Sequence, residues 1–200
     1  MAQGHDGNDD SSSRFARRSY LKLLGGAVGM ASITGSTVAQ TAETAQVAQT
    51  DSVVDLGEQG LSEGDVIDGY LEEYFESGVE VRIPEGEYEY HGSGLGGSRS
   101  NAALVGVGEV IFTNEVGTYR ETIEAEGGPV EVRNVTLRKA ARVDDGDEAR
   151  FRLQAGADGH LVIDNFNLPD GVEDPGNAIG FYVPSDHAGV IEIRNCYIAN

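Results

Sequence analysis

Two arginines in the second half of the chain are the first candidates for chemistry. Arg150 and Arg152 alternate with apolar residues, which is typical of a β-strand with one buried face, so both guanidinium groups should point outward. A similar segment thirty residues later places Tyr182 beside Arg152, and alignment of the preceding segment adds Thr122 and Glu124. A guanidinium fork suits a carboxylate, and a tyrosine ring offers its face to a sugar. These residues predict a surface that binds acidic polysaccharide; pairing of the arginines with acidic loops is the competing explanation.

Two acidic loops, 142–148 and 169–174, come before and after this strand. Their carboxylates are Asp144, Asp145, Asp147, Glu148, Asp170, Glu173 and Asp174. Ca²⁺ prefers many oxygen ligands, so Asp144, Asp145, Asp147, Asp170 and Asp174 could hold Ca²⁺ that an acidic sugar completes. The alternative is a solvated acidic surface, because every loop of the chain is acidic and no spacing matches a defined calcium loop.

The overall charge excludes some partners and suggests an environment. The 200 residues contain 34 Asp and Glu against 14 Lys and Arg, a formal net charge of −20. A polyanion such as nucleic acid needs a basic footprint, so we expect no nucleic-acid partner. Beyond residue 39 the only lysine is Lys139. Such an acidic, lysine-poor surface is typical of proteins from extreme halophiles, in which molar salt screens carboxylate repulsion.

The N-terminus predicts export. Arg17 and Arg18 precede a weakly apolar, Gly-interrupted run and a small-residue cleavage site, so residues 1–39 resemble a twin-arginine signal peptide. This predicts a secreted protein that meets the twin-arginine translocon during export. The apolar run is shorter than the ~20 residues that a membrane span needs, so we expect no span in the mature chain. Residues 40–52 are predicted to form a flexible linker.

An internal repeat runs through the second half. The segments 130–137, 161–168 and 191–198 align on Asn134, Asn165 and Asn195, which are 31 and 30 residues apart. Each segment predicts two short strands joined at the asparagine, with a third strand before them. The predicted inward residues are Val130, Val132, Val135, Leu137, Leu161, Ile163, Phe166, Leu168, Ile191, Ile193, Cys196 and Ile198. Repeats without helices must stack as coils, with parallel strands about 4.8 Å apart around an aliphatic core.

The asparagines are predicted to form a structural ladder. Asparagine tolerates the left-handed conformation of a tight corner, and its amide can bond to the coils on either side. Asn134 also begins a glycosylation sequon, but Asn165 and Asn195 occupy the same corner without one, which favours the ladder. The single cysteine, Cys196, cannot form an internal disulfide and is expected to be a small buried residue.

The first half predicts how the stack begins. An N-cap at Ser62 and apolar residues recurring every four positions predict a helix over about 62–77, placed to cover the open end of the solenoid. An alternating strand over 79–88, broken at a Pro-Glu-Gly turn, and the apolar segments 103–108 and 110–112 supply the first coils.

These segments in this order resemble the pectate-lyase-like superfamily. The resemblance rests on Val54-Asp55-Leu56-Gly57, the helix, the Val-Arg-Ile-Pro-Glu-Gly-Glu-Tyr run ending at Tyr88 and Leu104-Val105-Gly106-Val107-Gly108, and it covers about residues 53–200. It implies an all-β right-handed parallel β-helix with an N-terminal capping α-helix. Because the last coil lacks a cap, we expect either that coils continue beyond residue 200 or that a partner caps the chain.

The resemblance implies two classes of function. In family lyases an Arg or Lys acts as base beside calcium, which makes Arg150 and Arg152 candidate catalytic residues, although no defined lyase motif surrounds them. The polygalacturonase motif is not supplied by Asp158-Gly159-His160, and the histidines show no metal-ligand spacing. The sequence therefore predicts a secreted, salt-adapted protein that acts on or binds acidic polysaccharide, as a lyase or glycoside hydrolase, or alternatively a non-catalytic cell-surface, glycan-binding or structural β-helix.

Overall fold

The computed structural model describes residues 48–114, 121–138, 149–171 and 179–199. They belong to one compact unit that spans Glu43–Asn200. The predicted signal peptide, including Arg17 and Arg18, and most of the predicted linker lie outside the described residues. The first strand begins at Ser52, the last position of that linker.

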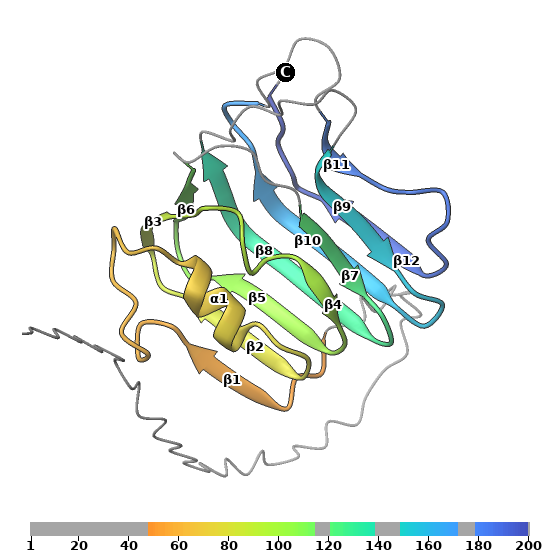
Figure 1. Ribbon diagram of the computed structural model, residues 1–200, viewed down its shortest axis with the longest axis horizontal. Helices are drawn as coiled ribbons and strands as arrows, with labels where there is room; N and C mark the ends of the chain where they lie inside the picture. Colours follow the sequence, from red (N-terminus) through yellow and green to blue (C-terminus); the bar gives the residue numbers. More distant parts are fainter. Residues whose placement is uncertain (1–47, 115–120, 139–148, 172–178, 200) are drawn as a thin grey trace, which may run out of the picture. The chain divides into compact units, whose positions relative to one another are not determined.

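Parallel strands form the framework of the described chain. Sheet A contains β1 (Ser52–Asp55), β2 (Val79–Ile83), β5 (Ala102–Gly106), β8 (Pro129–Arg138), β10 (His160–Asn167) and β12 (Val190–Arg194), in this spatial order, with β3 (Gly86–Glu89) and β6 (Val110–Thr113) beside it. Sheet B contains β4 (Gly97–Arg99), β7 (Glu121–Ala125), β9 (Ala149–Ala155) and β11 (Ile179–Tyr182). Every pairing between these strands is parallel (Figure 1).

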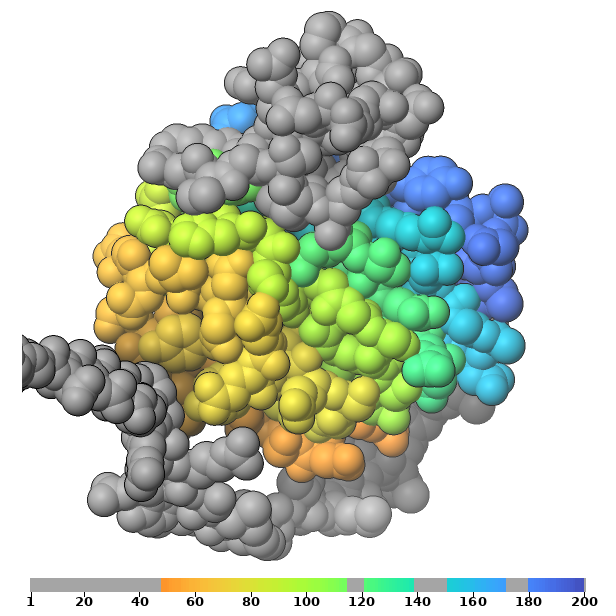
Figure 2. Space-filling model, viewed as in Figure 1, coloured from red at the N-terminus to blue at the C-terminus, as the bar shows by residue number. Residues whose placement is uncertain are grey.

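The strands form a parallel β-solenoid of about four turns. The chain passes from a strand of sheet B to a strand of sheet A in each turn, and the next turn stacks on it in register. Ile163, for example, pairs with Val132 of the preceding coil and Ile193 of the following one. In the space-filling view the coils follow each other as adjacent colour bands (Figure 2). The predicted all-β, parallel stack is therefore confirmed.

The core follows the alternation seen in the sequence. In the coils of β8 and β10 every predicted inward residue is buried: Val130, Val132, Val135, Leu137, Leu161, Ile163, Phe166 and Leu168. Phe151 and Phe166 meet edge to face inside the stack, with ring centroids 5.3 Å apart. The last described coil differs, because Ile193 and Ile198 are 44% and 40% exposed. The inward pattern is the same there, but no further described strand covers it.

Asparagines at the corners adopt the left-handed conformation. The φ angles of Asn134, Asn165 and Asn195 are 58°, 51° and 54°, and Asn101, which the repeat search did not find, has 53°. The Asn165 amide donates to Asn134 Oδ1 at 3.2 Å, and the Asn134 amide donates to the Gly106 carbonyl at 3.3 Å. At the last corner, the Asn195 amide instead donates to Asp164 Oδ1 at 2.8 Å.

The helix is shorter than predicted. It spans Asp68–Tyr74 rather than 62–77, because the residues before it pair with a strand. Gly64 and Ile67 donate backbone hydrogen bonds to the carbonyls of Glu87 and Glu89, and the Asp65 carboxylate accepts from the Ser62 backbone. The segment forms a turn in which the Asp65 N–H donates to the Ser62 carbonyl at 3.0 Å, and Ile67 occupies the N-cap position, so Ser62 is not the N-cap. In the described part of the chain no helix is long and apolar enough to cross a membrane.

The helix α1 packs beside the segment that leads into β4. A Cβ atom on Gly94 would lie 2.6 Å from Leu71 Cβ, so glycine is required for this close approach. The carboxylate of Asp68 accepts hydrogen bonds from the backbone N–H groups of His91 and Ser93 at 2.8–3.1 Å. The helix is thus fixed next to the first strand of sheet B (Figure 1).

Candidate functional site

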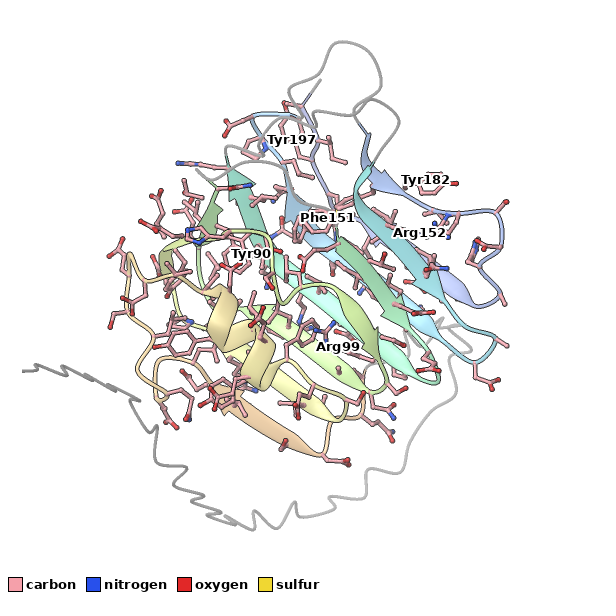
Figure 3. The ribbon with its side chains drawn as sticks, viewed as in Figure 1. Tyr90, Arg99, Phe151, Arg152, Tyr182 and Tyr197 are labelled. Carbon is pink, nitrogen blue, oxygen red and sulfur yellow. The ribbon has the colours of Figure 1, made fainter. Side chains whose placement is uncertain are left out.

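The outer face of sheet B carries a row of polar side chains across three coils. Thr122 of β7, Arg152 of β9 and Tyr182 of β11 are register partners, so they lie side by side. Their neighbours Ile123, Leu153 and Phe181 point into the core. Strand alternation therefore turns the row outward, and Arg152 and Tyr182 lie next to each other in Figure 3. The side chain of Arg152 is 42% exposed and Tyr182 is 43% exposed.

Arg152 makes one long ionic contact within the described residues. Its Nη2 atom lies 3.6 Å from the carboxylate of Asp186, in the segment after β11, and that carboxylate is largely exposed. Its Nε atom is buried and has no hydrogen-bond partner in the part of the chain that the structure describes. Because an exposed ion pair of this length contributes little to stability, a stronger carboxylate ligand could replace Asp186 at small cost. A planar guanidinium binds such a ligand through two parallel hydrogen bonds.

A second row runs beside the first. Ser98, Glu124 and Gln154 are register partners on β4, β7 and β9. The Ser98 hydroxyl donates to the carboxylate of Glu126 at 3.0 Å. Together the two rows offer one cation, hydroxyl and amide groups, carboxylates and an aromatic face. This is a suitable lining for a hydrated, acidic sugar chain that crosses the coils.

Other predicted site residues are placed only in part. Arg150 lies in β9, but its side chain is not described. Asp144, Asp145, Asp147 and Asp174 lie outside the described residues. Asp170 follows β10 and has an interaction partner. In the described residues no group of three or more His, Cys, Asp or Glu side chains is arranged to hold a metal ion.

A buried ionic group near α1 was missed by the sequence analysis. Arg99, at the end of β4, lies over the ring of Phe75 and donates to the carbonyls of Phe75, Gly94, Leu95 and Gly96. Nearby, the buried carboxylate of Glu121 accepts hydrogen bonds from the Tyr90 hydroxyl and the Gly96 backbone. The alternation Glu121, Ile123, Ala125 was the available signal, because it already turns Glu121 inward.

Burial dominates the electrostatics of this group. Burial lowers the pKa of Arg99 to about 10, against the opposing effect of the Glu121 charge. Burial also raises the pKa of Glu121, although hydrogen bonds from Tyr90 and Gly96 and the Arg99 charge oppose the rise. Because both groups are enclosed and fully engaged, we interpret this ionic group as structural: it joins the segment after α1 to β4 and β7 (Figure 3).

The outer face of sheet A is also charged. Arg133, Asp164 and Arg194 are neighbours in one row, and Glu131, Val162 and Glu192 in the next. The ring of His160 pairs with Glu192 at 2.9 Å, so this histidine has a partner and is mostly covered. The Ala48 backbone donates to Glu131 at 3.0 Å, so the segment before β1 contacts β8. This face is consequently partly occupied by the chain itself.

A hollow lies beside β3. The cavity has a volume of about 540 Å³, and its lining residues are Glu63, Gly64, Glu87, Tyr88, Glu89 and Thr113. The Thr113 hydroxyl donates to Glu87 at 2.7 Å, which ties one carboxylate to the wall. The remaining carboxylates give the hollow a negative character that disfavours an acidic sugar.

The chain matches no protein-family model, and comparisons with curated proteins and with solved structures find no significant match. The fold itself defines the class: the chain is a parallel β-solenoid protein with a polar outer face on each of its two sheets.

Proposed function

We propose that the protein binds acidic polysaccharide along the outer face of sheet B. The observation that carries this proposal is the row of register partners Thr122, Arg152 and Tyr182. Adjacent coils of a parallel stack are about 4.8 Å apart, so the row presents a cation next to an aromatic ring within the length of one sugar residue. Arg152 would bind a uronate carboxylate in place of Asp186, and Tyr182 would pack against a ring.

We further propose that the solenoid is a right-handed β-helix of the pectate-lyase-like kind whose first sheet B strand is closed by α1. Two general rules of β-sheet structure support this proposal. Crossovers between parallel strands of one sheet are right-handed in about 98% of cases, and a helix beside β4 blocks a sheet edge that would otherwise pair with other chains. We also propose that the protein is exported by the twin-arginine route and is adapted to high salt. The paired Arg17 and Arg18 support the first point, and the net charge of −20 supports the second.

Cleavage of the bound polysaccharide would be a more specific version of this function. A lyase-like reaction would use Arg152, or Arg150 on the same strand, as the base that removes the proton next to a uronate carboxylate, and the glycosidic oxygen on the adjacent carbon would leave to give the unsaturated product. If Ca²⁺ were held by the predicted ligands Asp144, Asp145, Asp147, Asp170 and Asp174, it would make that proton more acidic. Non-catalytic glycan binding or a structural role at the cell surface is the second candidate. It is favoured by the ion pair between Arg152 and Asp186 at 3.6 Å, because this contact engages the guanidinium as a charged binding group.

The test incubates the full chain in molar KCl, with and without Ca²⁺, with polygalacturonate, alginate and a neutral glucan. Binding is followed by co-sedimentation, cleavage by the absorbance of unsaturated products and by reducing ends. We expect retention on the acidic polymers, and a loss of about tenfold to a hundredfold in affinity for Arg152→Gln, because a charge-assisted contact contributes ~1.5–3 kcal/mol.

The matched control is Arg82→Gln. Arg82 is a similarly exposed arginine, paired with Glu80 at 2.7 Å, but it lies on sheet A. Equal loss in both variants would show that general charge, not the sheet B face, carries binding. Unsaturated products would identify a lyase, and reducing ends alone a hydrolase. Binding without products would favour the non-catalytic candidate.

A further inference from the structure

The outer face of sheet A is covered in its middle and open at its ends. One outward row of register partners crosses this sheet from β1 to β12: Val53, Glu80, Ala103, Glu131, Val162 and Glu192. Ala103, Glu131 and Val162, in the middle of the row, are 2%, 6% and 3% exposed, whereas Val53 at one end is 54% exposed. Because strand alternation turns these side chains away from the core, the core is not what covers the middle three.

The segment before β1 lies over this row. The Ala48 N–H donates to Glu131 Oε1 at 3.0 Å, although Ser52 begins β1, three strands away from β8 in the sheet. Neighbouring strands are about 4.8 Å apart, so the segment covers about 14 Å between Ala48 and Ser52, which requires a nearly extended chain. Exposure alternates over residues 48–51, with Ala48 and Thr50 half-buried, as expected for an extended segment on a surface.

The carboxylate of Glu131 depends on this contact. Its Oε1 atom accepts from Ala48, and its Oε2 atom lies 3.7 Å from Arg133 Nη1. A carboxylate that is withdrawn from water is stable only when hydrogen bonds and charges replace its hydration. One of the two contacts of Glu131 therefore comes from the segment before β1, which crosses the face of the sheet.

We propose that residues 43–51 form a strap that docks across the outer face of sheet A and covers Val162. Ala48 lies over β8, and β10, which carries Val162, is the next strand in the same direction. One more strand spacing needs only about one or two further residues, and the chain from Glu43 onward belongs to the same compact unit as the sheet.

The composition of the segment suits this face. Residues 44–50 contain no charged side chain, although the whole chain has a net charge of −20. The segment can therefore lie beside Glu131 and over Ala103 and Val162 without adding a carboxylate to a face that already carries several.

The strap makes sheet A a docking surface that the chain itself occupies. It joins β1, at one end of the stack, to β8 and β10, so it holds the first coil against later ones by contacts outside the strand ladder. Only residues 40–42 separate it from the predicted signal peptide, so removal of that peptide would leave the strap as the N-terminal segment of the exported chain. The inference is independent of the proposed polysaccharide site, which lies on sheet B.

The test measures thiol reactivity in the full chain, with Cys196→Ser as the background. Val162→Cys and Val53→Cys each place one thiol in the same outward row of sheet A. At constant molar KCl, we expect a water-soluble maleimide to modify Val53→Cys at least about tenfold faster than Val162→Cys, because the strap covers only the second position.

Ala48→Pro then tests whether the strap is the cover. Proline has no N–H, so Glu131 loses this donor. We expect the Val162→Cys thiol to react about tenfold to a hundredfold faster, the range that corresponds to loss of one charge-assisted hydrogen bond. The matched control is Gln49→Pro, which keeps the Ala48 N–H and favours an extended conformation at residue 48, and it should leave the reactivity unchanged.

Circular dichroism melting confirms that each variant is folded. Equal reactivity of Val162→Cys and Val53→Cys would overturn the proposal. So would a Val162→Cys thiol that stays protected in Ala48→Pro, because neighbouring side chains of the sheet would then be its cover. Equal acceleration by Ala48→Pro and Gln49→Pro would also overturn it, because the contact with Glu131 would then not hold the strap in place.

Discussion

The side-chain amide of Asn165 donates a 3.2 Å hydrogen bond to the amide oxygen of Asn134 on the neighbouring coil. Both residues have positive φ, so each corner of the solenoid combines a strained backbone conformation with a bond between coils. The two contributions can be separated, because glycine adopts the same backbone without the amide.

We expect Asn165→Ala to lower the free energy of unfolding by more than Asn165→Gly. In the alanine variant the left-handed conformation lowers stability by ~1–2 kcal/mol and the hydrogen bond is lost as well. In the glycine variant only the hydrogen bond is lost. Guanidinium unfolding in molar KCl, followed by circular dichroism, measures both variants. Equal losses would mean that the amide bond, rather than the conformation, governs the corner.

Replacing Arg99 is expected to be the most damaging single change near α1. Arg99→Ala leaves five backbone carbonyls without their donor and removes a charge that favours the ionised form of Glu121, which should cost about 3–5 kcal/mol. Arg99→Lys should recover little, because an ammonium lacks the planar fork. The exposed Arg82→Ala is the control and should change stability by less than ~1 kcal/mol. Comparable effects at the two positions would contradict the structural role of Arg99.

The raised pKa of Glu121 predicts a pH dependence of stability. Burial disfavours the ionised form in the folded state, so the contribution of Glu121 is most favourable below the pKa of the unfolded chain and declines as pH rises through the raised folded pKa. Glu121→Gln does not titrate and lacks this decline. Its stability relative to the wild type should therefore improve as pH increases across that window.

Unfolding at a series of pH values in constant KCl measures the Glu121 effect. Glu124→Gln, on the outer face three residues later, controls for the removal of one carboxylate. If both variants alter the profile alike, burial of Glu121 is not the cause.

The acidic composition predicts salt dependence. A net charge of −20 is self-repulsive, and the Debye length shortens to about 3 Å at 1 M salt, so the folded chain should melt at a higher temperature in molar than in low KCl. Thermal scans across a KCl series measure this. Equal melting temperatures would refute the proposed adaptation to salt.

The coils were predictable from the sequence because they depend on local patterns. Alternation over two residues turned Val130, Val132, Leu161 and Ile163 inward, and a spacing of about thirty residues required neighbouring segments to stack. The side-by-side position of Arg152 and Tyr182 follows from the same register.

The ends of the stack depended on contacts between distant segments, which no local pattern contains. Pairing of Gly64 and Ile67 with β3 removed the predicted first turns of the helix. The approach of α1 to β4 enclosed Arg99 with Glu121, although these residues are separated by a whole coil. Asn195 turned to Asp164 instead of continuing the ladder to Asn165. Sequence periodicity thus determined the repeating unit, whereas tertiary packing decided how the repeat begins and which side chains meet, because those energies come from long-range burial and hydrogen bonding.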